Sequence, residues 1–461
     1  MPSSAPIESQ GEAPTNLWHA LRDFDRGTKI FLLFTAVNST AFGIYALCFN
    51  LYAAAIGYTN AQIGALNAVP AIGMLAIGLP SGFLVNRFGF RRFLVLSTGL
   101  MTVAPLALWV FGPKTGSVSY IILFSIGNSL IWVLSGPLLA GLGRPQARVQ
   151  LFSLNAFILT VSIALGSLIG GAIPEWRATL LHISANSAGA LGATFIASGV
   201  LNALSFALVW VMKLPQPLQA APAISATKHA DVAVHVQRND WGLFARLVAP
   251  SALIGLGAGA FITFQQLYFR QRFLLSPGPI ATIFAISQGV TALAILLAPL
   301  MAQHIGRVRT AIVTQFASIP LLILLGFTNH LALALGAFYV RGALMNMGAP
   351  VAEALAMDLL PPSQRAAYSS VTNALGNLGR GGIGPLISGA LQVIGGYGAA
   401  FSFTALTYAV SSICYFAFFR HVEPDYHLRD IFGPFARWLA IPTGASVTRA
   451  DGDESAPLAS R

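Results

Sequence analysis

Two arginines lie inside stretches of sequence that are otherwise apolar and long enough to cross a membrane. Arg341 is about ten residues, or ~15 Å, into one such stretch, and Arg380 is about fourteen residues, or ~21 Å, into the next. A guanidinium near the middle of a bilayer costs from ~2.5 to well over ~10 kcal/mol unless it faces partners or water. Both arginines are therefore candidates for binding a substrate or for gating. The alternative is a structural role, in which each is hydrogen-bonded to carbonyl groups or paired with an acid.

Glu353 is the one acid, of fifteen in the chain, that we place within an apolar stretch. A proton-coupled carrier needs a group along its path that changes protonation, usually a carboxylate, so Glu353 is the candidate for proton coupling. It follows Arg341 by twelve residues, which is roughly 120° around and ~18 Å along an ideal helix, so the two cannot pair directly. The alternative is an interfacial carboxylate at the end of its helix.

These residues need an apolar scaffold, and the composition provides one. Hydrophobic residues make up 55% of the 461-residue chain and charged residues only 9%, whereas soluble domains carry about 25% charged residues. The net charge of +11 is spread between apolar stretches rather than clustered, which argues against a nucleic-acid partner. We find no nucleophile–base pair, metal cluster or phosphate loop in the sequence. We therefore expect no enzyme activity, metal site or cofactor.

Twelve segments are predicted to cross the membrane, and the fold class is an all-α membrane protein. Backbone groups in lipid must be satisfied within the segment, which makes each span a helix. The predicted spans are 30–56, 61–85, 91–112, 118–142, 149–174, 190–212, 244–269, 277–303, 309–328, 331–357, 366–394 and 397–420.

The spans divide into two groups of six. We expect six-helix bundles over residues 28–213 and 244–420, joined by a cytoplasmic linker over 214–243 that is rich in Ala, Pro and Gln. Tails are expected over 1–27 and 421–461.

The distribution of positive charge predicts the orientation. Of the 26 Lys and Arg residues, 20 fall on segments that are cytoplasmic if the N-terminus is cytoplasmic, and four fall on outer segments. This bias follows the positive-inside rule. Both termini are therefore expected in the cytoplasm, with the chain in the inner (cytoplasmic) cell membrane.

The two halves repeat each other. Gly89 matches Gly306 and Arg148 matches Arg365, both pairs 217 residues apart, and ten identities lie within one residue of this offset. Because each copy has an even number of spans, the copies have the same membrane orientation. Parallel repeats of this kind predict a substrate site between the halves at mid-depth.

Between the second and third predicted spans, residues 82–92 read G-F-L-V-N-R-F-G-F-R-R, and a shorter copy lies between spans eight and nine. Together with the twelve spans, the central linker and the repeat, these loops resemble the signature loop of the major facilitator superfamily, G-x-x-x-D-R-x-G-R-[RK]-[RK]. The resemblance covers residues ~28–420. It implies a gating and topology role for the loop, because in that family the loop helps to hold the halves together on the cytoplasmic side. The residues so assigned are Gly82, Asn86, Arg87, Gly89, Arg91, Arg92, Gly306, Arg307 and Arg309.

The loop departs from the family pattern at one place, since Asn86 replaces the usual aspartate and reduces a charged interaction to neutral hydrogen bonding. A second likeness lies in the fifth span, where residues 166–171 read G-S-L-I-G-G. This run resembles a degraded form of the family's antiporter motif, G-P-x-x-G-G. The alternative is close helix packing combined with a weak point for bending.

In that family, spans 1, 4, 7 and 10 line a central cavity, and neutral polar residues occur on these spans here. Asn50 and Gln266 occupy equivalent places in the two repeats, which favours facing positions across the cavity. Interhelical hydrogen bonding is the alternative for each single residue. The residues expected to bind the solute are Arg341, Arg380, Gln265, Gln266, Asn50, Asn128, Asn346 and Tyr45.

The leading hypothesis is a secondary active transporter that moves a small organic solute by alternating access. We expect a monomer that exports amphipathic or anionic compounds, in exchange for a coupling proton or counter-anion, on resemblance to the drug-exporter-like branch. Uptake or exchange of an organic anion is the second hypothesis. A membrane receptor with a transporter fold is a third, and the lack of a sizeable soluble output domain counts against it.

The predicted topology can be tested by thiol labelling. Cysteines introduced by Lys228→Cys and Arg437→Cys should react with an impermeant reagent only from the cytoplasmic side, and Lys114→Cys only from outside, because of the positive-inside bias. Labelling of position 228 from outside would contradict the twelve-span arrangement.

Overall fold

The computed structural model describes residues 24–71, 73–74, 89–142, 148–212 and 241–419, and all regular structure in these ranges is helical. A helix that begins at Asn60 is described as far as residue 74, with a gap at residue 72. The other elements are α2 (Arg26–Ala55), α4 (Phe90–Val103), α5 (Leu106–Val110), α6 (Pro113–Leu142), α7 (Arg148–Leu181), α8 (Ala188–Val211), α9 (Trp241–Ile262), α10 (Gln265–Phe273), α11 (Pro277–Ile305), α12 (Arg307–Phe327), α13 (Leu331–Leu359), α14 (Pro362–Leu378), η2 (Gly379–Ile383) and α15 (Gly384–Phe419).

Ten helical segments in the described ranges are long and apolar enough to cross a membrane. The last of them, Ser363–Phe419, has 57 residues and contains a break at Gly395 and Gly396. Gly396 has φ 63° and ψ −162°, a conformation that other residues rarely adopt. The break falls between the predicted spans 366–394 and 397–420, so this segment accounts for two of them. The predicted span 61–85 is described only in part, and the described helices are consistent with the twelve expected.

Two predicted spans are interrupted. The third divides into α4 and α5 at Pro105, which has no N–H to donate to the helix. The seventh divides into α9 and α10 at Thr263 and Phe264, where neither Pro nor Gly marks the interruption. The helix α9 begins at Trp241, three residues before the predicted start.

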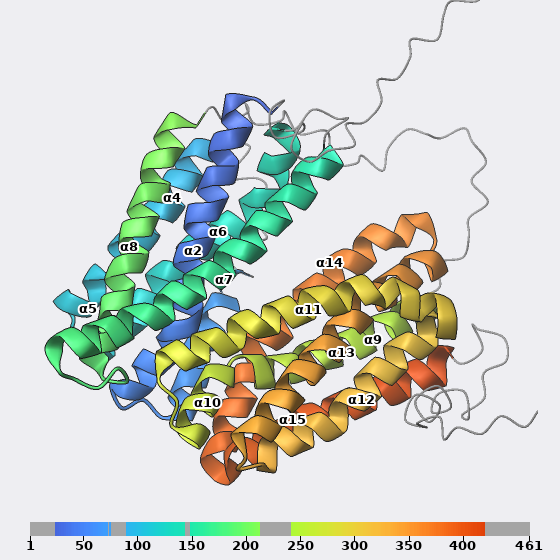
Figure 1. The fold of residues 1–461 in the computed structure, drawn as a ribbon. Helices are drawn as coiled ribbons and strands as arrows, with labels where there is room; N and C mark the ends of the chain where they lie inside the picture. Colours follow the sequence, from blue (N-terminus) through green and yellow to red (C-terminus); the bar gives the residue numbers. More distant parts are fainter. Residues whose placement is uncertain (1–23, 72, 75–88, 143–147, 213–240, 420–461) are drawn as a thin grey trace, which may run out of the picture.

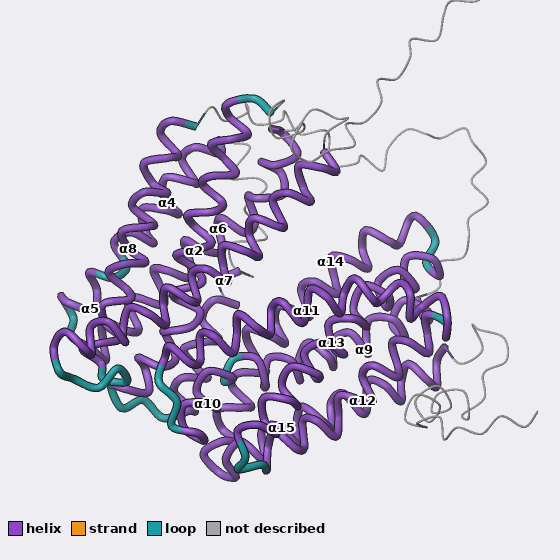
Figure 2. Tube along the Cα trace, in the orientation of Figure 1, coloured by secondary structure: helices purple, strands orange, loops and turns teal. Residues whose placement is uncertain are grey.

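The helices form two groups that approach each other at one end and diverge at the other (Figure 1). One group contains α2 to α8 and the other α9 to α15, and the connections at the joined end are short loops (Figure 2). Residues 1–23, 213–240 and 420–461, which hold the predicted linker and tails almost entirely, lie outside the described residues.

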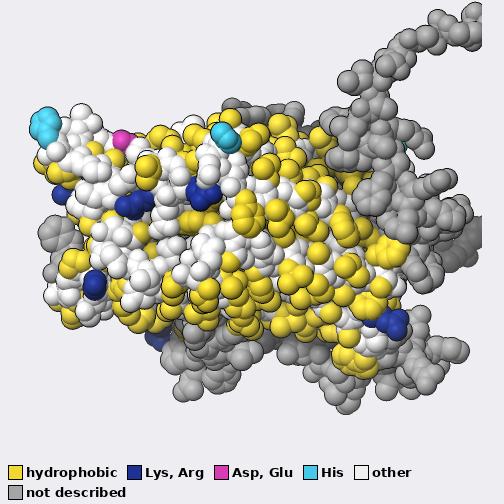
Figure 3. Space-filling model, turned by 90° about the horizontal axis from the view of Figure 1, so that it is seen from below, with side chains coloured by type: hydrophobic (Ala, Val, Ile, Leu, Met, Phe, Trp, Pro, Cys, Tyr) yellow, Lys and Arg dark blue, Asp and Glu magenta, His cyan; other side chains and the backbone are white. Residues whose placement is uncertain are grey.

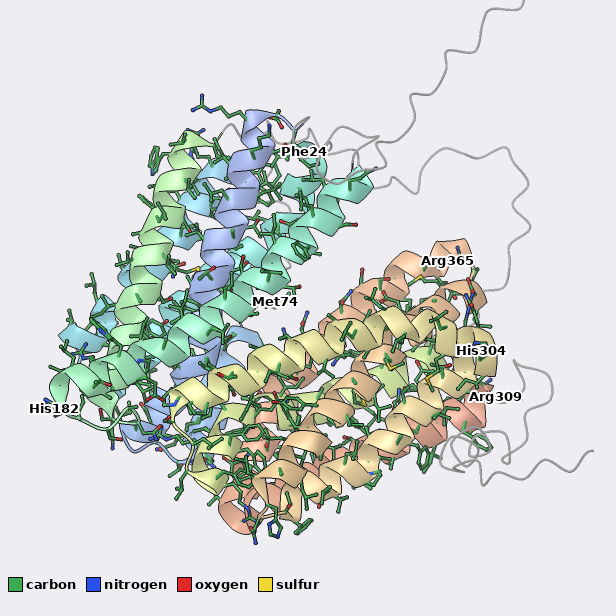
Figure 4. The ribbon with its side chains drawn as sticks, in the orientation of Figure 1. Phe24, Met74, His182, His304, Arg309 and Arg365 are labelled. Atoms are coloured by element: carbon green, nitrogen blue, oxygen red, sulfur yellow. The ribbon has the colours of Figure 1, made fainter. Side chains whose placement is uncertain are left out.

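The exposed surface is that expected of a protein in lipid. Seen from below, hydrophobic side chains cover a broad part of the molecule, and the few Lys, Arg and His side chains lie mostly towards its ends (Figure 3). Large apolar side chains such as Leu296 (72% exposed) and Ile413 (55% exposed) face outwards. Arg309 and Arg365, both predicted to be cytoplasmic, lie at the end of their bundle away from the contact, and His182 lies at the joined end (Figure 4).

The sequence repeat has a counterpart in backbone geometry. Gly89 precedes α4 with φ 78° and ψ 155°, and Gly306 precedes α12 with φ 90° and ψ 159°. Residues other than glycine are strained at such φ values. The two copies of the signature loop therefore enter the following helix in the same way, which explains the glycine in each.

Glycines allow the closest helix contacts, including those of the proposed antiporter motif. A Cβ at Gly166 would lie 3.0 Å from the Cα of Gly43 on α2, and one at Gly171 would lie 2.8 Å from the carbonyl oxygen of Pro277 on α11. The run 166–171 thus packs α7 against its own bundle and also against the other bundle. Such contacts between small residues stabilise helix pairs in membranes by close van der Waals approach.

Two reciprocal hydrogen bonds join the bundles at their closed end. The Asn50 amide donates to the carbonyl oxygen of Thr263 at 2.6 Å, and the Gln266 amide donates to the carbonyl oxygen of Ala46 at 3.2 Å. Thr263 follows Ala46 by 217 residues and Gln266 follows Asn50 by 216. Each half therefore offers the other the same type of contact. Asn67 also donates to the Asn50 side-chain oxygen at 2.7 Å, so both ends of this buried amide are satisfied.

Further polar contacts surround this pair. Arg270 on α10 donates to the carbonyl oxygens of Leu51 and Asn186, both in the first half. The Glu175 carboxylate on α7 accepts from the backbone N–H of Gly278 at the start of α11, at 3.0 Å. We call the contacts of Asn50, Gln266, Arg270 and Glu175 the end closure. Their number indicates that opening this end requires several hydrogen bonds to break together.

Asn50→Ala should shift the protein towards a state in which this end is open. The change removes one hydrogen bond between the halves and leaves the Thr263 carbonyl without this partner, at a cost of about 1–3 kcal/mol. Spin labels on His182→Cys and His330→Cys, in a Cys414→Ser background, should report a larger population of long distances. Asn128→Ala, which lies away from the end closure, should leave the distances unchanged. An unaltered distribution in Asn50→Ala would contradict this role.

Candidate functional site

Each bundle contains a cavity, and the two cavities lie at equivalent places in the repeat. The N-terminal cavity is enclosed by α2, α6 and α7 and has a volume of about 380 Å³. The C-terminal cavity, of about 250 Å³, is enclosed mainly by α9, α13, α14 and α15. Of these helices, α7 and α14 border the space between the diverging bundles (Figure 1).

The N-terminal cavity is lined mostly by aromatic and aliphatic side chains. Trp132 and Phe152 are 47% and 42% exposed, so their rings are available to a ligand. Its polar groups are partly engaged with each other or with neighbouring helices. Thr35 donates to the Asn155 side-chain oxygen at 3.0 Å, and Asn38 lies 3.3 Å from the Asn202 side-chain oxygen. The cavity therefore suits an apolar group.

The C-terminal cavity is polar and brings together four of the residues selected from the sequence. Arg341 and Asn346 come from α13, Arg380 comes from η2, and Glu353 lies near the opposite end of α13. In the described residues, neither arginine forms an ion pair with an acid. Further lining groups that can form hydrogen bonds are Ser251, Gln315, Tyr368, Thr372, Asn373, Asn377, Tyr408 and Tyr415.

Arg341 is held by aromatic side chains rather than by an acid. Its guanidinium carbon lies 4.1 Å from the ring centre of Phe261 and 5.6 Å from that of Tyr408, and its Nη2 donates to the Tyr408 hydroxyl at 2.8 Å. Cation–π contacts stabilise an arginine more strongly when it is removed from water, and Arg341 is only 5% exposed. Its Nε has no hydrogen-bond partner among the described residues. One donor of the buried guanidinium is thus left for a ligand.

Arg380 lies on a π-helical turn that the local sequence favours. Pro385 cannot donate to the carbonyl of Gly381 four residues earlier, and the surrounding glycines allow the helix to widen. This turn packs closely on α9, since a Cβ at Gly259 would lie 2.7 Å from the Cα of Arg380. The Arg380 side chain is exposed in the cavity. Single π-helical turns are frequent at functional sites.

The other proposed binding residues lie elsewhere. Asn128 lines the N-terminal cavity. Asn50 and Gln266, expected to face each other across a cavity, belong to the end closure, and Gln265 is buried next to it at the start of α10. Tyr45 packs with Phe124, ring centres 4.2 Å apart, inside the first bundle. Neither cavity contains these four residues.

The signature loop is described in part. Gly82, Asn86 and Arg87 lie outside the described residues. Arg91 donates to the carbonyl oxygen of Met212 at 2.8 Å and so ties the start of α4 to the end of α8. In the second copy, Arg307 forms an ion pair with Asp358 at the end of α13.

Sequence reasoning did not select the aromatic partners of Arg341 or the aromatic residues Trp132 and Phe152. An aromatic residue in an apolar span has no distinguishing signal, because lipid, helix packing and a ligand all favour it. Within the described residues, no three His, Cys, Asp or Glu side chains come together as a metal site would require.

Comparison with known proteins identifies the fold. The family profile of the Major Facilitator Superfamily matches residues 31–288 and 247–441. An uncharacterized MFS-type transporter, YxaM of Bacillus subtilis, is 32% identical over 113 residues, which is 24% of this chain and 26% of that protein. That alignment thus spans about a quarter of the curated relative.

Two solved structures share the overall arrangement. A bacterial homologue of the human lysosomal transporter Spinster, in an inward-facing and occupied conformation, superposes with a TM-score of 0.66 over 87% of this chain and 97% of its own. The nucleoside transporter NupG superposes with a TM-score of 0.66 over 86% and 100%. Each is 14% identical to this chain, so these likenesses concern the fold alone.

Substitutions of Arg341 should distinguish the contribution of its positive charge to binding from that of its planar guanidinium. Arg341→Lys keeps a positive charge but loses the planar fork, so binding of an anionic solute should weaken by about tenfold. Arg341→Ala should weaken it by about a hundredfold, because hydrogen bonds to charged groups are worth about 1.5–3 kcal/mol. Binding to the purified protein, measured by titration calorimetry, checks both values.

Arg272→Ala is the matched control, since Arg272 donates to loop carbonyls at the joined end and lies outside both cavities. A neutral solute of the same shape should lose much less affinity in each Arg341 variant. If Arg341→Ala is monodisperse and binds anions normally, Arg341 does not contact the solute.

Proposed function

Because the chain belongs to the major facilitator superfamily, a family of transporters rather than enzymes, we propose that it is a secondary transporter that exports an amphipathic organic anion by alternating access. It is a multi-pass membrane protein, with an apolar surface and helices of spanning length. The proposal extends from the family to a substrate class. That step depends on the two cavities described above.

The observation that carries the proposal is the opposite character of the two cavities. The N-terminal cavity offers the exposed rings of Trp132 and Phe152, whereas the C-terminal cavity offers Arg341 and Arg380. A solute with an apolar part and an anionic part can satisfy both at once. A purely apolar solute would leave the two guanidinium groups without an anionic partner, and a small hydrophilic anion would gain nothing from the rings.

The conformation fits one stage of alternating access. We propose that the end closure faces outwards and that the diverging ends face the cytoplasm, in the inner (cytoplasmic) membrane, with the termini on the cytoplasmic side. This orientation follows the positive-inside rule. It also agrees with the inward-facing conformation of the Spinster homologue of similar fold. In this state a cytoplasmic solute could enter between the bundles of a single, monomeric chain.

Proton exchange is the coupling that we propose. Glu353 lines the C-terminal cavity on the helix that also carries Arg341, but about 18 Å further along it. It is exposed, so a proton can reach it from the space between the bundles. Proton gradients of opposite direction, imposed in turn on proteoliposomes, would distinguish export in exchange for protons from uptake of an organic anion.

Trp132→Ala should selectively weaken transport of solutes with a large apolar part. Loss of about 60 Å² of apolar contact would raise the KM about tenfold at ~25 cal/mol per Å². A solute with the same anionic group and a short chain should be affected about twofold or less. Uptake of labelled solute into inside-out vesicles provides the measurement.

Trp210→Ala provides the control, because Trp210 is 57% exposed on α8 and lines neither cavity. Equal losses in both tryptophan variants, or equal losses for long and short solutes, would argue against an apolar subsite in the N-terminal cavity.

A further inference from the structure

Arg341 and Arg380 both approach one stretch of α9, Arg341 with its guanidinium and Arg380 with its backbone. The face around Ala258 lines the C-terminal cavity. Gly259 lies to one side of it, against the backbone of Arg380, and Phe261 lies to the other side, against the guanidinium of Arg341. Two residues along a helix correspond to ~3 Å. The Arg341 guanidinium and the Arg380 backbone therefore flank the deep end of the cavity at a similar level, and both residues line it.

This level is also next to the end closure. Phe261 lies two residues before Thr263. The carbonyl oxygen of Thr263 accepts a hydrogen bond from Asn50 of the other half. On the opposite side, a Cβ at Gly381 or Gly382, directly after Arg380, would lie 3.4 Å from the Ala71 side chain of the first half. The deep end of the C-terminal cavity thus lies where the two halves meet.

Among the residues that the structure describes, no acid pairs with either positive charge at this depth. Glu353 is about 18 Å away along α13, and neither arginine forms an ion pair within the described residues. The Nε donor of the buried Arg341 also has no partner in the described part of the chain. Unpaired charge is unfavourable at the buried Arg341, and the exposed Arg380 adds a second positive charge to the same cavity, so a ligand that brings two negative charges would be favoured over one that brings a single charge.

We infer that the polar head of the transported solute is a dianionic oxyanion, of the type of a phosphate monoester, held between Arg341 and Arg380. This inference rests on the proposed function and specifies the head group of its substrate. Both arginines line the same cavity, and each guanidinium has donors suited to phosphate oxygens. The apolar tail extends towards the N-terminal cavity.

The charge on the head can be tested with two probes of the same shape. Octyl phosphate at pH 8 is dianionic, and octyl sulfate has the same chain and a tetrahedral head with one negative charge. Titration calorimetry on the protein in lipid nanodiscs, with empty nanodiscs as the blank, should show octyl phosphate binding about tenfold tighter, because charge-assisted hydrogen bonds form to both arginines rather than one. Equal affinities in the unmodified protein would overturn the inference without any substitution.

Variants then assign the preference to Arg380. Arg380→Gln should reduce the phosphate-to-sulfate ratio to about twofold or less, while Arg380→Lys should retain most of it because the charge remains. Arg272→Gln, outside both cavities, should leave the ratio unchanged. A tenfold preference that persists in a folded Arg380→Gln variant would contradict the two-arginine site.

The outcomes also separate this inference from the proposed function. If both octyl probes bind equally and both lose affinity in Trp132→Ala, the amphipathic substrate class stands and the dianionic head is wrong. If neither probe depends on Trp132 and neither is transported, the proposed function itself is wrong.

Discussion

In the hydrocarbon core of a membrane there is no water to hydrogen-bond to the backbone, so every backbone N–H and C=O group needs a partner within the protein. The arrangement of this molecule follows from that constraint. One interruption within the described residues shows how a freed backbone group finds a partner. At the interruption between α9 and α10, the carbonyl oxygen of Thr263 accepts from Asn50 of the other half. The carbonyl group that the interruption frees from the helix thus forms a contact between the bundles. The closure at this end depends on it.

The repeat provides the scaffold, and differences between its copies provide the chemistry. Arg341 follows Phe124 by 217 residues, and Phe124 packs against Tyr45 in the first bundle, with ring centres 4.2 Å apart. In the second bundle the guanidinium of Arg341 lies in a comparable aromatic setting, against Phe261. At the same offset, Arg380 corresponds to Ile163 of the N-terminal cavity. Two substitutions in a duplicated framework thus account for much of the contrast between an apolar and a basic cavity.

Close packing of helices brings the apolar N-terminal cavity and the basic C-terminal cavity near the junction of the halves. Gly259 lets the backbone of η2 approach α9, and Gly171 lets α7 approach α11. A side chain at either position would push the helices apart. The contacts between the halves include close approaches of small residues and a limited set of hydrogen bonds, which can form and break without rearranging the bundles themselves. Alternating access requires contacts of this kind.

The sequence alone was sufficient to predict the features that depend on whether a residue prefers lipid or water. Apolar stretches predicted the spans, and the predicted boundary between the last two fell at Gly395 and Gly396, where the structure has its break. The cost of burying a guanidinium singled out Arg341 and Arg380, which line one cavity. Such features are local, because each residue's preference for lipid or water is its own.

Only the tertiary structure decided which groups meet. The interruption at Thr263 has no proline or glycine to predict it, and the place of Asn50 in the end closure depends on how α2 crosses the other bundle. Likewise, the partners of Arg341 come from α9 and α15, far apart in the chain. Periodicity tells which face of a helix avoids lipid, but several helices can cover that face equally well. The choice among them is made by the packing of the whole molecule.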